Sequence, residues 1–245
     1  MKLLLPFFFL ITSLMGEDIY ATFDVVARKE ANLALTTSGV VKILRVDVGS
    51  RVKKGEVLLE VDNDNLVAGV DLAKESLKKA KIEEQFAHQT YNRYKKVESV
   101  IDAELMDQNT LQYQKSSAAL GEAKAQLRYQ NTLVEKTRLR APFSGVISQR
   151  NVELGDGVGG STLPLFKLIS DKEVKLIVQF DEKYRIKVKK GAAIRYRVDG
   201  EIQWRNGTIA KLYPTVNPKN RKATAEVLTT HIAPGLFGEA YILGK

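Results

Sequence analysis

The sequence predicts an elongated protein of mixed α and β class, in which a split β-sandwich is interrupted by an antiparallel coiled-coil α-hairpin. Three observations predict this fold class. A glycine-containing strand–turn–strand pattern occurs twice, once on each side of a long central region. That central region, residues 64–137, contains no proline and carries an apolar heptad repeat. After residue 142, apolar and polar residues alternate as they do in strands.

The N-terminus has the layout of a secretory signal. Lys2 gives a basic start, residues 3–14 are largely apolar, and Gly16 is a small residue in front of acidic ones. An uncleaved membrane anchor is the alternative, but spanning a bilayer takes about 20 apolar residues and this run is shorter. We therefore expect export with cleavage after Gly16. The chain has no cysteine, which excludes disulfides, thiolate metal sites and a lipidated N-terminal cysteine.

The formal net charge of +9 makes nucleic acid a candidate partner for this chain. Lysine and arginine are, however, interspersed with aspartate and glutamate along most of the sequence. We interpret the charge as a solvated basic surface and predict no nucleic-acid partner.

The central region is predicted to form two long helices that pack along one seam. A repeat of seven residues keeps that seam turned toward a partner helix. The break near residues 99–102 is short, so the helices are expected to run antiparallel and to reach roughly 50 Å. Asp102 is the expected N-cap of the second helix, and Asp64 that of the first. The alternative is a plain helical spacer or dimerisation coil. The seam positions are Leu66, Val70, Ala73, Leu77, Ala80, Ala87, Tyr91 and Tyr94, then Met106, Tyr113, Leu120, Leu127 and Val134, with Ser116 and Ala123 between them.

The β segments that flank the helices repeat one unit. Gly39 and Gly49 have the same spacing as Gly145 and Gly155, and an apolar valine follows each second glycine by the same step. A single unit would expose an apolar sheet face and be unstable alone. The two units, residues 38–61 and 144–169, are therefore predicted to dock on each other and to bring the ends of the hairpin together.

At this point the chain resembles a known family. The two β units are similar to the halves of a lipoyl or biotinyl domain. The run Arg140-Ala141-Pro142-Phe143-Ser144-Gly145-Val146 resembles the signature of periplasmic adaptor (membrane fusion) proteins of tripartite efflux pumps of the resistance–nodulation–division type. A lipoyl carrier would present a lysine on a tight turn between the halves, where this chain has the helical region. We therefore do not expect carrier function.

The resemblance implies a lipoyl-like sandwich and a small β-barrel. It also implies a periplasmic adaptor that links an inner-membrane, proton-driven transporter to an outer-membrane channel and exports drugs or other toxic solutes. Self-association into a ring of six follows from the same resemblance. An adaptor of an ATP-driven exporter or secretion system is the alternative, although several such adaptors retain a membrane helix. The expected domains are a signal at 1–16, a barrel from 17–36 and 172–245, a lipoyl-like domain from 37–63 and 138–171, and the hairpin at 64–137.

The family resemblance also points to the hairpin tip as the surface that meets the outer-membrane channel. Family tips carry an arginine, a leucine four residues on, and an isoleucine–serine pair. Arg93 matches the arginine, Val97 stands in the place of the leucine, and Ile101 and Asp102 occupy the place of the pair. The planar guanidinium of Arg93 suits carbonyls or carboxylates on a facing helix.

The sequence contains no residue pattern that predicts catalysis, and we expect no enzyme activity, cofactor or metal. His88 and His231 are the only histidines, and both are expected on the surface. Residues 62–65 begin like a calcium loop but lack its glycine and its closing glutamate.

Overall fold

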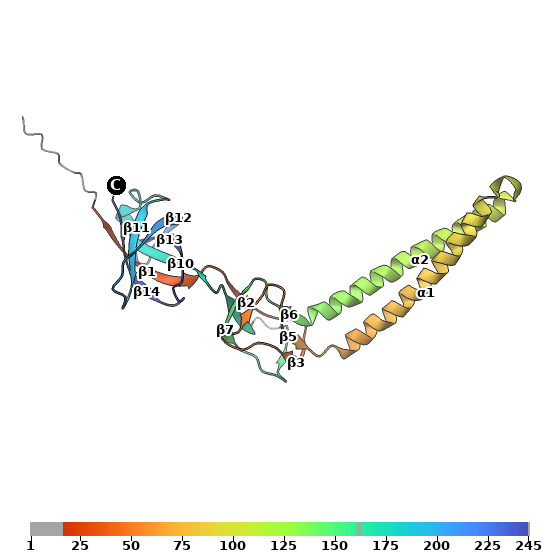
Figure 1. Ribbon diagram of the computed structural model, residues 1–245, viewed down its shortest axis with the longest axis horizontal. Helices are drawn as coiled ribbons and strands as arrows, with labels where there is room; N and C mark the ends of the chain where they lie inside the picture. Colours follow the sequence, from red (N-terminus) through yellow and green to blue (C-terminus); the bar gives the residue numbers. More distant parts are fainter. Residues whose placement is uncertain (1–16, 161–162, 245) are drawn as a thin grey trace, which may run out of the picture. The chain divides into compact units, whose positions relative to one another are not determined.

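The computed structural model describes residues 17–160 and 163–244, so the predicted signal peptide lies outside the described residues. The chain divides into two compact units, each described by itself below. The first unit comprises residues 1–31 and 169–245, and the second comprises residues 32–168. Figure 1 shows the strands of the first unit, the smaller sheets of the second, and the two long helices.

The first unit is a closed six-stranded barrel. All neighbouring strands run antiparallel, in the order β1-β10-β13-β12-β11-β14. Inward-facing residues alternate with outward-facing ones, as the sequence predicts for β10, where Val174, Leu176, Val178 and Phe180 are all buried. The strands are β1 (Ile19–Ala27), β10 (Glu173–Asp181), β11 (Ala193–Val198), β12 (Arg205–Asn217), β13 (Lys222–Thr230) and β14 (Phe237–Ile242).

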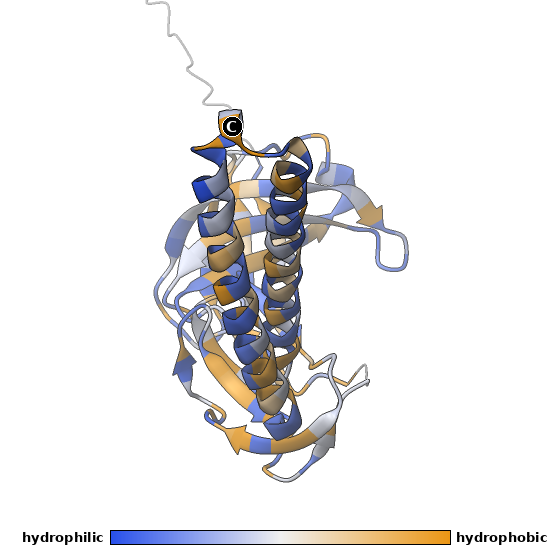
Figure 2. Cartoon of the chain, turned by 90° about the vertical axis from the view of Figure 1, so that its right-hand side faces the viewer, coloured by the Kyte–Doolittle hydropathy of each residue, from blue (hydrophilic) through white to orange (hydrophobic). Residues whose placement is uncertain are grey.

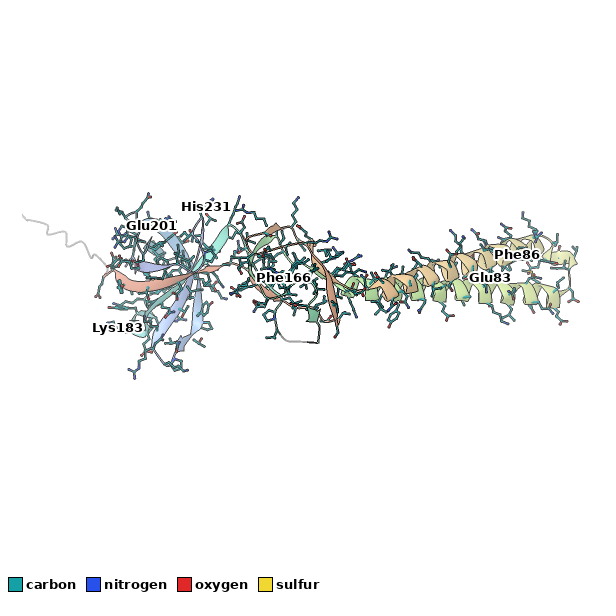
Figure 3. All side chains as sticks on the ribbon, turned by 90° about the horizontal axis from the view of Figure 1, so that it is seen from below. Glu83, Phe86, Phe166, Lys183, Glu201 and His231 are labelled. Atoms are coloured by element: carbon teal, nitrogen blue, oxygen red, sulfur yellow. The ribbon has the colours of Figure 1, made fainter. Side chains whose placement is uncertain are left out.

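The second unit contains a sandwich of two four-stranded sheets. One sheet has the order β2-β9-β7-β4 and the other β6-β5-β3-β8. Phe166, labelled in Figure 3, is completely buried in this unit. The strands are β2 (Glu30–Leu33), β3 (Gly39–Leu44), β4 (Arg51–Val52), β5 (Val57–Val61), β6 (Arg138–Arg140), β7 (Gly145–Arg150), β8 (Gly157–Val158) and β9 (Phe166–Ile169).

The two repeated segments interleave, which confirms the predicted docking of one on the other. Gly39 pairs with Val158, and at the equivalent place in the second repeat Gly145 pairs with Val52. The hydrogen bonds repeat as well. The Gly49 N–H donates to the Ile147 carbonyl at 2.8 Å, and its counterpart, the Gly155 N–H, donates to the Val41 carbonyl at 2.9 Å. Each half therefore completes the sheet of the other.

Between the halves, α1 (Asp64–Lys95) and α2 (Ala103–Lys136) form the antiparallel hairpin. The N-cap prediction at Asp102 is confirmed, since its carboxylate accepts the Glu104 N–H at 2.9 Å. The prediction for Asp64 is wrong. Asp64 is the first helical residue, Asn63 occupies the cap position without a side-chain capping bond, and the Asp64 carboxylate instead pairs with Lys42.

One further expectation differs from the structure. Residues 30–35 were assigned to the barrel, but β2 (Glu30–Leu33) pairs with β9 in the sandwich, because the chain leaves the barrel ladder after Ala27. After β10 the chain forms a 3₁₀ turn, η2 (Glu182–Tyr184). Val188 turns inward to fill the barrel core, with 2% of its surface exposed.

Candidate partner-binding hairpin

The hairpin seam is narrow because its most buried positions are small. Ala73, Ala80 and Ala87 of α1 and Ser116 and Ala123 of α2 are buried. Val70 is buried as well, whereas the other large seam residues are half-buried. Small side chains allow two helices to approach closely. The outward faces are mainly hydrophilic, as Figure 2 shows along both helices. Most of the hairpin surface is therefore free for contacts other than those that hold it together.

Near the tip the seam changes from small to aromatic residues. Tyr113 of α2 stacks against Tyr91 of α1, with ring centroids 5.3 Å apart, and against His88 at 4.9 Å. The Nζ of Lys95 lies 5.5 Å from the centre of the Tyr91 ring. His88 is exposed, as the sequence predicts, and its ring also packs across the helix pair. Aromatic stacking of this kind adds about 0.5–1.5 kcal/mol beyond area burial and stabilises the end of the hairpin farthest from the sandwich.

The turn at the tip is longer than the sequence suggested. Helix α1 ends at Lys95, and a 3₁₀ turn, η1 (Glu98–Val100), leads to α2. The Val97 N–H donates to the Tyr94 carbonyl, and the Val100 N–H donates to the Val97 carbonyl, both at 3.0 Å. These i→i+3 bonds tighten the last turn and reverse the chain direction.

The four predicted tip residues lie around this turn. Arg93 is exposed in the last turn of α1 and donates to the Thr90 hydroxyl at 3.2 Å. Val97 is 44% exposed, Ile101 is half-buried, and Asp102 caps α2. The sequence analysis missed Val100, which is 81% exposed and is the most exposed large apolar side chain at the tip. An apolar residue two positions before a capping aspartate, in a short turn, was the signal that could have identified Val100.

A buried polar joint holds the base of the hairpin on the sandwich. The Asn63 amide donates to Glu60 Oε1 at 2.7 Å and to Thr137 Oγ1 at 2.9 Å. The Thr137 hydroxyl donates to the Val134 carbonyl at 2.6 Å. Asn63 and Thr137 expose 7% and 0% of their surfaces. We call Glu60, Asn63, Thr137 and Arg138 the joint.

Charge pairing completes the joint. The Arg138 guanidinium donates to Glu60 Oε2 at 3.0 Å, and the side chain of Glu60 is only 13% exposed. Burial alone would raise the pKa of Glu60, but hydrogen bonds from Arg138 and Asn63 favour the ionised form, and the net effect lowers the pKa. Arg140 also pairs with Glu135 at the end of α2 and lowers the pKa of that carboxyl.

No group of three or more His, Cys, Asp or Glu side chains suited to a metal ion occurs within residues 17–160 and 163–244. His231 is exposed in a turn with a φ of 63°. Over the same ranges, no helix combines the length and apolar character needed to cross a membrane.

Two interleaved β halves with a helical hairpin inserted between them, together with a β-barrel, define the fold of the membrane fusion proteins. The family model described as the CzcB-like, barrel-sandwich hybrid domain matches residues 29–168, more than half of the chain. The chain belongs to this family.

Individual relatives agree with this assignment. The chain is 27% identical over 234 residues to the cobalt-zinc-cadmium resistance protein CzcB of Cupriavidus metallidurans, which covers 88% of this chain but only 43% of CzcB. It is 25% identical over 225 residues to the macrolide export protein MacA of Escherichia coli O157:H7, covering 84% of this chain and 61% of MacA. The solved membrane fusion protein Spr0693 of Streptococcus pneumoniae R6 shares the fold, with a TM-score of 0.74, 14% identity, and coverage of 93% and 99% of the two chains.

Proposed function

We propose that this protein is an exported, periplasmic adaptor subunit of a tripartite efflux system. It links an inner-membrane, proton-driven transporter of the resistance–nodulation–division class to an outer-membrane channel, for export of drugs or other toxic solutes. The observation that carries this proposal is the two-helix arm mounted on a split sandwich by a buried, charge-paired joint. The short apolar leader supports the proton-driven class over the ATP-driven one.

The proposed role is mechanical rather than catalytic. Helices of 32 and 34 residues place the tip roughly 50 Å from the joint, which is much farther than the packing of a compact core requires. The exposed guanidinium of Arg93 and the apolar Val97 and Val100 offer one polar and two apolar contacts to a helical channel. Ile101 and Asp102 support the turn, and self-association into a ring of six encloses the conduit.

The cargo is tested with two panels, because one relative is named for cobalt, zinc and cadmium resistance and another for macrolide export. In-frame deletion in the native host is expected to sensitise cells to at least one panel, the three metal cations or amphiphilic compounds including macrolides. Expression of the wild-type chain in trans should restore resistance. Unchanged susceptibility to both panels, with the partner transporter expressed, would refute the efflux role.

The channel contact is tested with single cysteines, which are unambiguous because the natural chain has none. Arg93→Cys and Val97→Cys are expected to crosslink to an outer-membrane channel protein in intact cells. Lys124→Cys, on the exposed face of α2 away from the tip, serves as the matched control and should not crosslink to it. Crosslinks from the tip positions only to an inner-membrane protein would reverse the proposed orientation.

A further inference from the structure

Basic residues that are scattered in the sequence gather at one end of the barrel. The register of the strands places the end of β10, the tip of the β12–β13 hairpin and the start of β11 at the same end as the start of β1. Figure 1 shows the C-terminus and the start of β1 on the same side of the barrel. Five carboxylates lie there: Glu17, Asp18, Asp181 and Glu182, and also Glu226, which is the cross-strand partner of Lys211. The nine cations there, which we call the basic end, are Lys183, Arg185, Lys187, Lys189, Lys190, Lys211, Lys219, Arg221 and Lys222.

The basic end is a built surface rather than a set of independent loops. The Glu182 N–H donates to the Arg221 carbonyl at 3.1 Å and joins segment 182–192 to the tip of the β12–β13 hairpin. The Gly191 N–H donates to the Ile209 carbonyl at 2.8 Å, and the Arg185 guanidinium donates to the Tyr213 carbonyl at 3.2 Å. The segment is thereby held across the mouth of the barrel, with Val188 inserted into the core.

The charges at the basic end are largely without acidic partners. Within the described part of the chain, Lys187, Lys189, Lys190 and Lys211 form no ion pair, and Lys183 reaches only Asp181, at 4.0 Å. The ammonium groups of Lys183 and Lys187 lie 4.8 and 5.7 Å from the centre of the Tyr184 ring. Arg185, Lys189, Lys190 and Lys211 contribute to the lining of a hollow of about 500 Å³. These groups are available to an external anion.

An aliphatic side chain projects from the middle of these cations. Ile186 is 89% exposed, although its neighbour Val188 is buried, and it also borders the hollow. Exposed aliphatic groups surrounded by lysine and arginine are typical of surfaces that bind the interface of an anionic bilayer.

We propose that the basic end of the barrel docks directly on anionic phospholipid headgroups, with Ile186 inserted among them. This inference goes beyond the proposed adaptor function, because it requires neither the transporter nor the channel. The lysines and arginines neutralise headgroup phosphates, and the hollow beside Ile186 accommodates one of them. An acidic protein surface would also attract these cations. The membrane is favoured because Ile186, 89% exposed in the middle of these cations, adds an aliphatic contact that suits a headgroup layer better than an acidic protein surface.

The test is vesicle co-sedimentation of the protein recovered after export, with its N-terminus established by mass spectrometry. Binding is compared on phosphatidylcholine vesicles and on vesicles in which a third of the lipid is phosphatidylglycerol, at low and high salt. The test variant is Lys187→Gln/Lys189→Gln/Lys190→Gln, and the matched control is Lys78→Gln/Lys79→Gln/Lys81→Gln on the exposed face of α1. The fluorescence of the single tryptophan, Trp204, verifies that the barrel of each variant is folded, and far-UV circular dichroism verifies the helices.

The wild type is expected to bind the anionic vesicles much more tightly than the neutral ones and to be released by salt. Each cation near the surface contributes about fivefold in affinity, so the test variant should lose on the order of a hundredfold, and the control about twofold or less. Ile186→Ser should lose about tenfold. Equal affinity of the wild type for both lipids, equal losses in the test and control variants, or no vesicle binding at all would overturn the proposal. The last result would favour an acidic protein partner instead.

Discussion

Replacing Asn63 by alanine is expected to weaken the joint at the base of the hairpin. The change removes the donor to Glu60 at 2.7 Å and the donor to Thr137 at 2.9 Å, both beneath a nearly closed surface. A bond to a charged group contributes about 1.5–3 kcal/mol and a neutral one about 1 kcal/mol, which gives a loss of roughly 2.5–4 kcal/mol. Capping does not add to this loss, since the Asn63 side chain makes no capping bond.

The assay is urea unfolding followed by far-UV circular dichroism, which reports the two long helices of the second unit. Trp204 fluorescence follows the barrel separately, because it is the only tryptophan. Asn65→Ala, two residues further on and exposed, is the matched control and should change the free energy of unfolding by less than about 0.7 kcal/mol. If Asn63→Ala also stayed within that range, the joint would not stabilise the hairpin and the reasoning would be refuted.

Two further predictions concern the second unit and the barrel in turn. The pKa of Glu60 is lower in the folded than in the unfolded state, so the stability that ionised Glu60 contributes is fully present above its unfolded pKa and is lost as the pH falls through its folded pKa. Glu60→Gln should therefore flatten the dependence of helix stability on pH below about pH 5. An unchanged slope would contradict this. In the barrel, a Cβ at Gly238 would lie 2.2 Å from the Arg197 carbonyl oxygen and 2.6 Å from Phe23 Cζ. Gly238→Ala should therefore destabilise the barrel by about 3 kcal/mol in the Trp204 assay, whereas Gly121→Ala, with open space on α2, should stabilise the helices by about 1 kcal/mol.

The parts of the fold that repeat in the sequence were predictable from it. The shared spacing of Gly39/Gly49 and Gly145/Gly155 predicted equivalent turns, and the structure gives the two sets of pairings equivalent hydrogen bonds. The heptad positions likewise fall on buried or half-buried sites along both helices. Periodicity succeeds in these cases because burial on one face is the physical cause of the pattern.

Contacts between segments far apart in the sequence could not be predicted in this way. Asn63 and Thr137 are individually unremarkable polar residues, and Asp62 to Asn65 suggested a cap or a calcium loop. The contact between Asn63 and Thr137 depends on the register of β5 with β6, which no local pattern encodes. The basic end was missed for the same reason. Its cations come from two strand connections and from β12 and β13, and they look interspersed along the chain, although the closed barrel collects them at one mouth.

The position of the joint explains why it is polar. Strands β5 and β6 pair in one sheet, and α1 begins three residues after β5 ends, whereas α2 ends two residues before β6 begins. Paired strands lie about 4.8 Å apart and packed helices about 8–10 Å apart, so the distance between the two chain segments must increase over these few residues. Where the two segments separate, buried polar groups find no hydrogen-bond partner in the sheet or in the helix seam. The Asn63 amide and the Thr137 hydroxyl fill that gap with hydrogen bonds, and these are directional where an apolar contact would not be. A polar joint can therefore stabilise the base of the hairpin and fix the direction in which the arm leaves the sandwich.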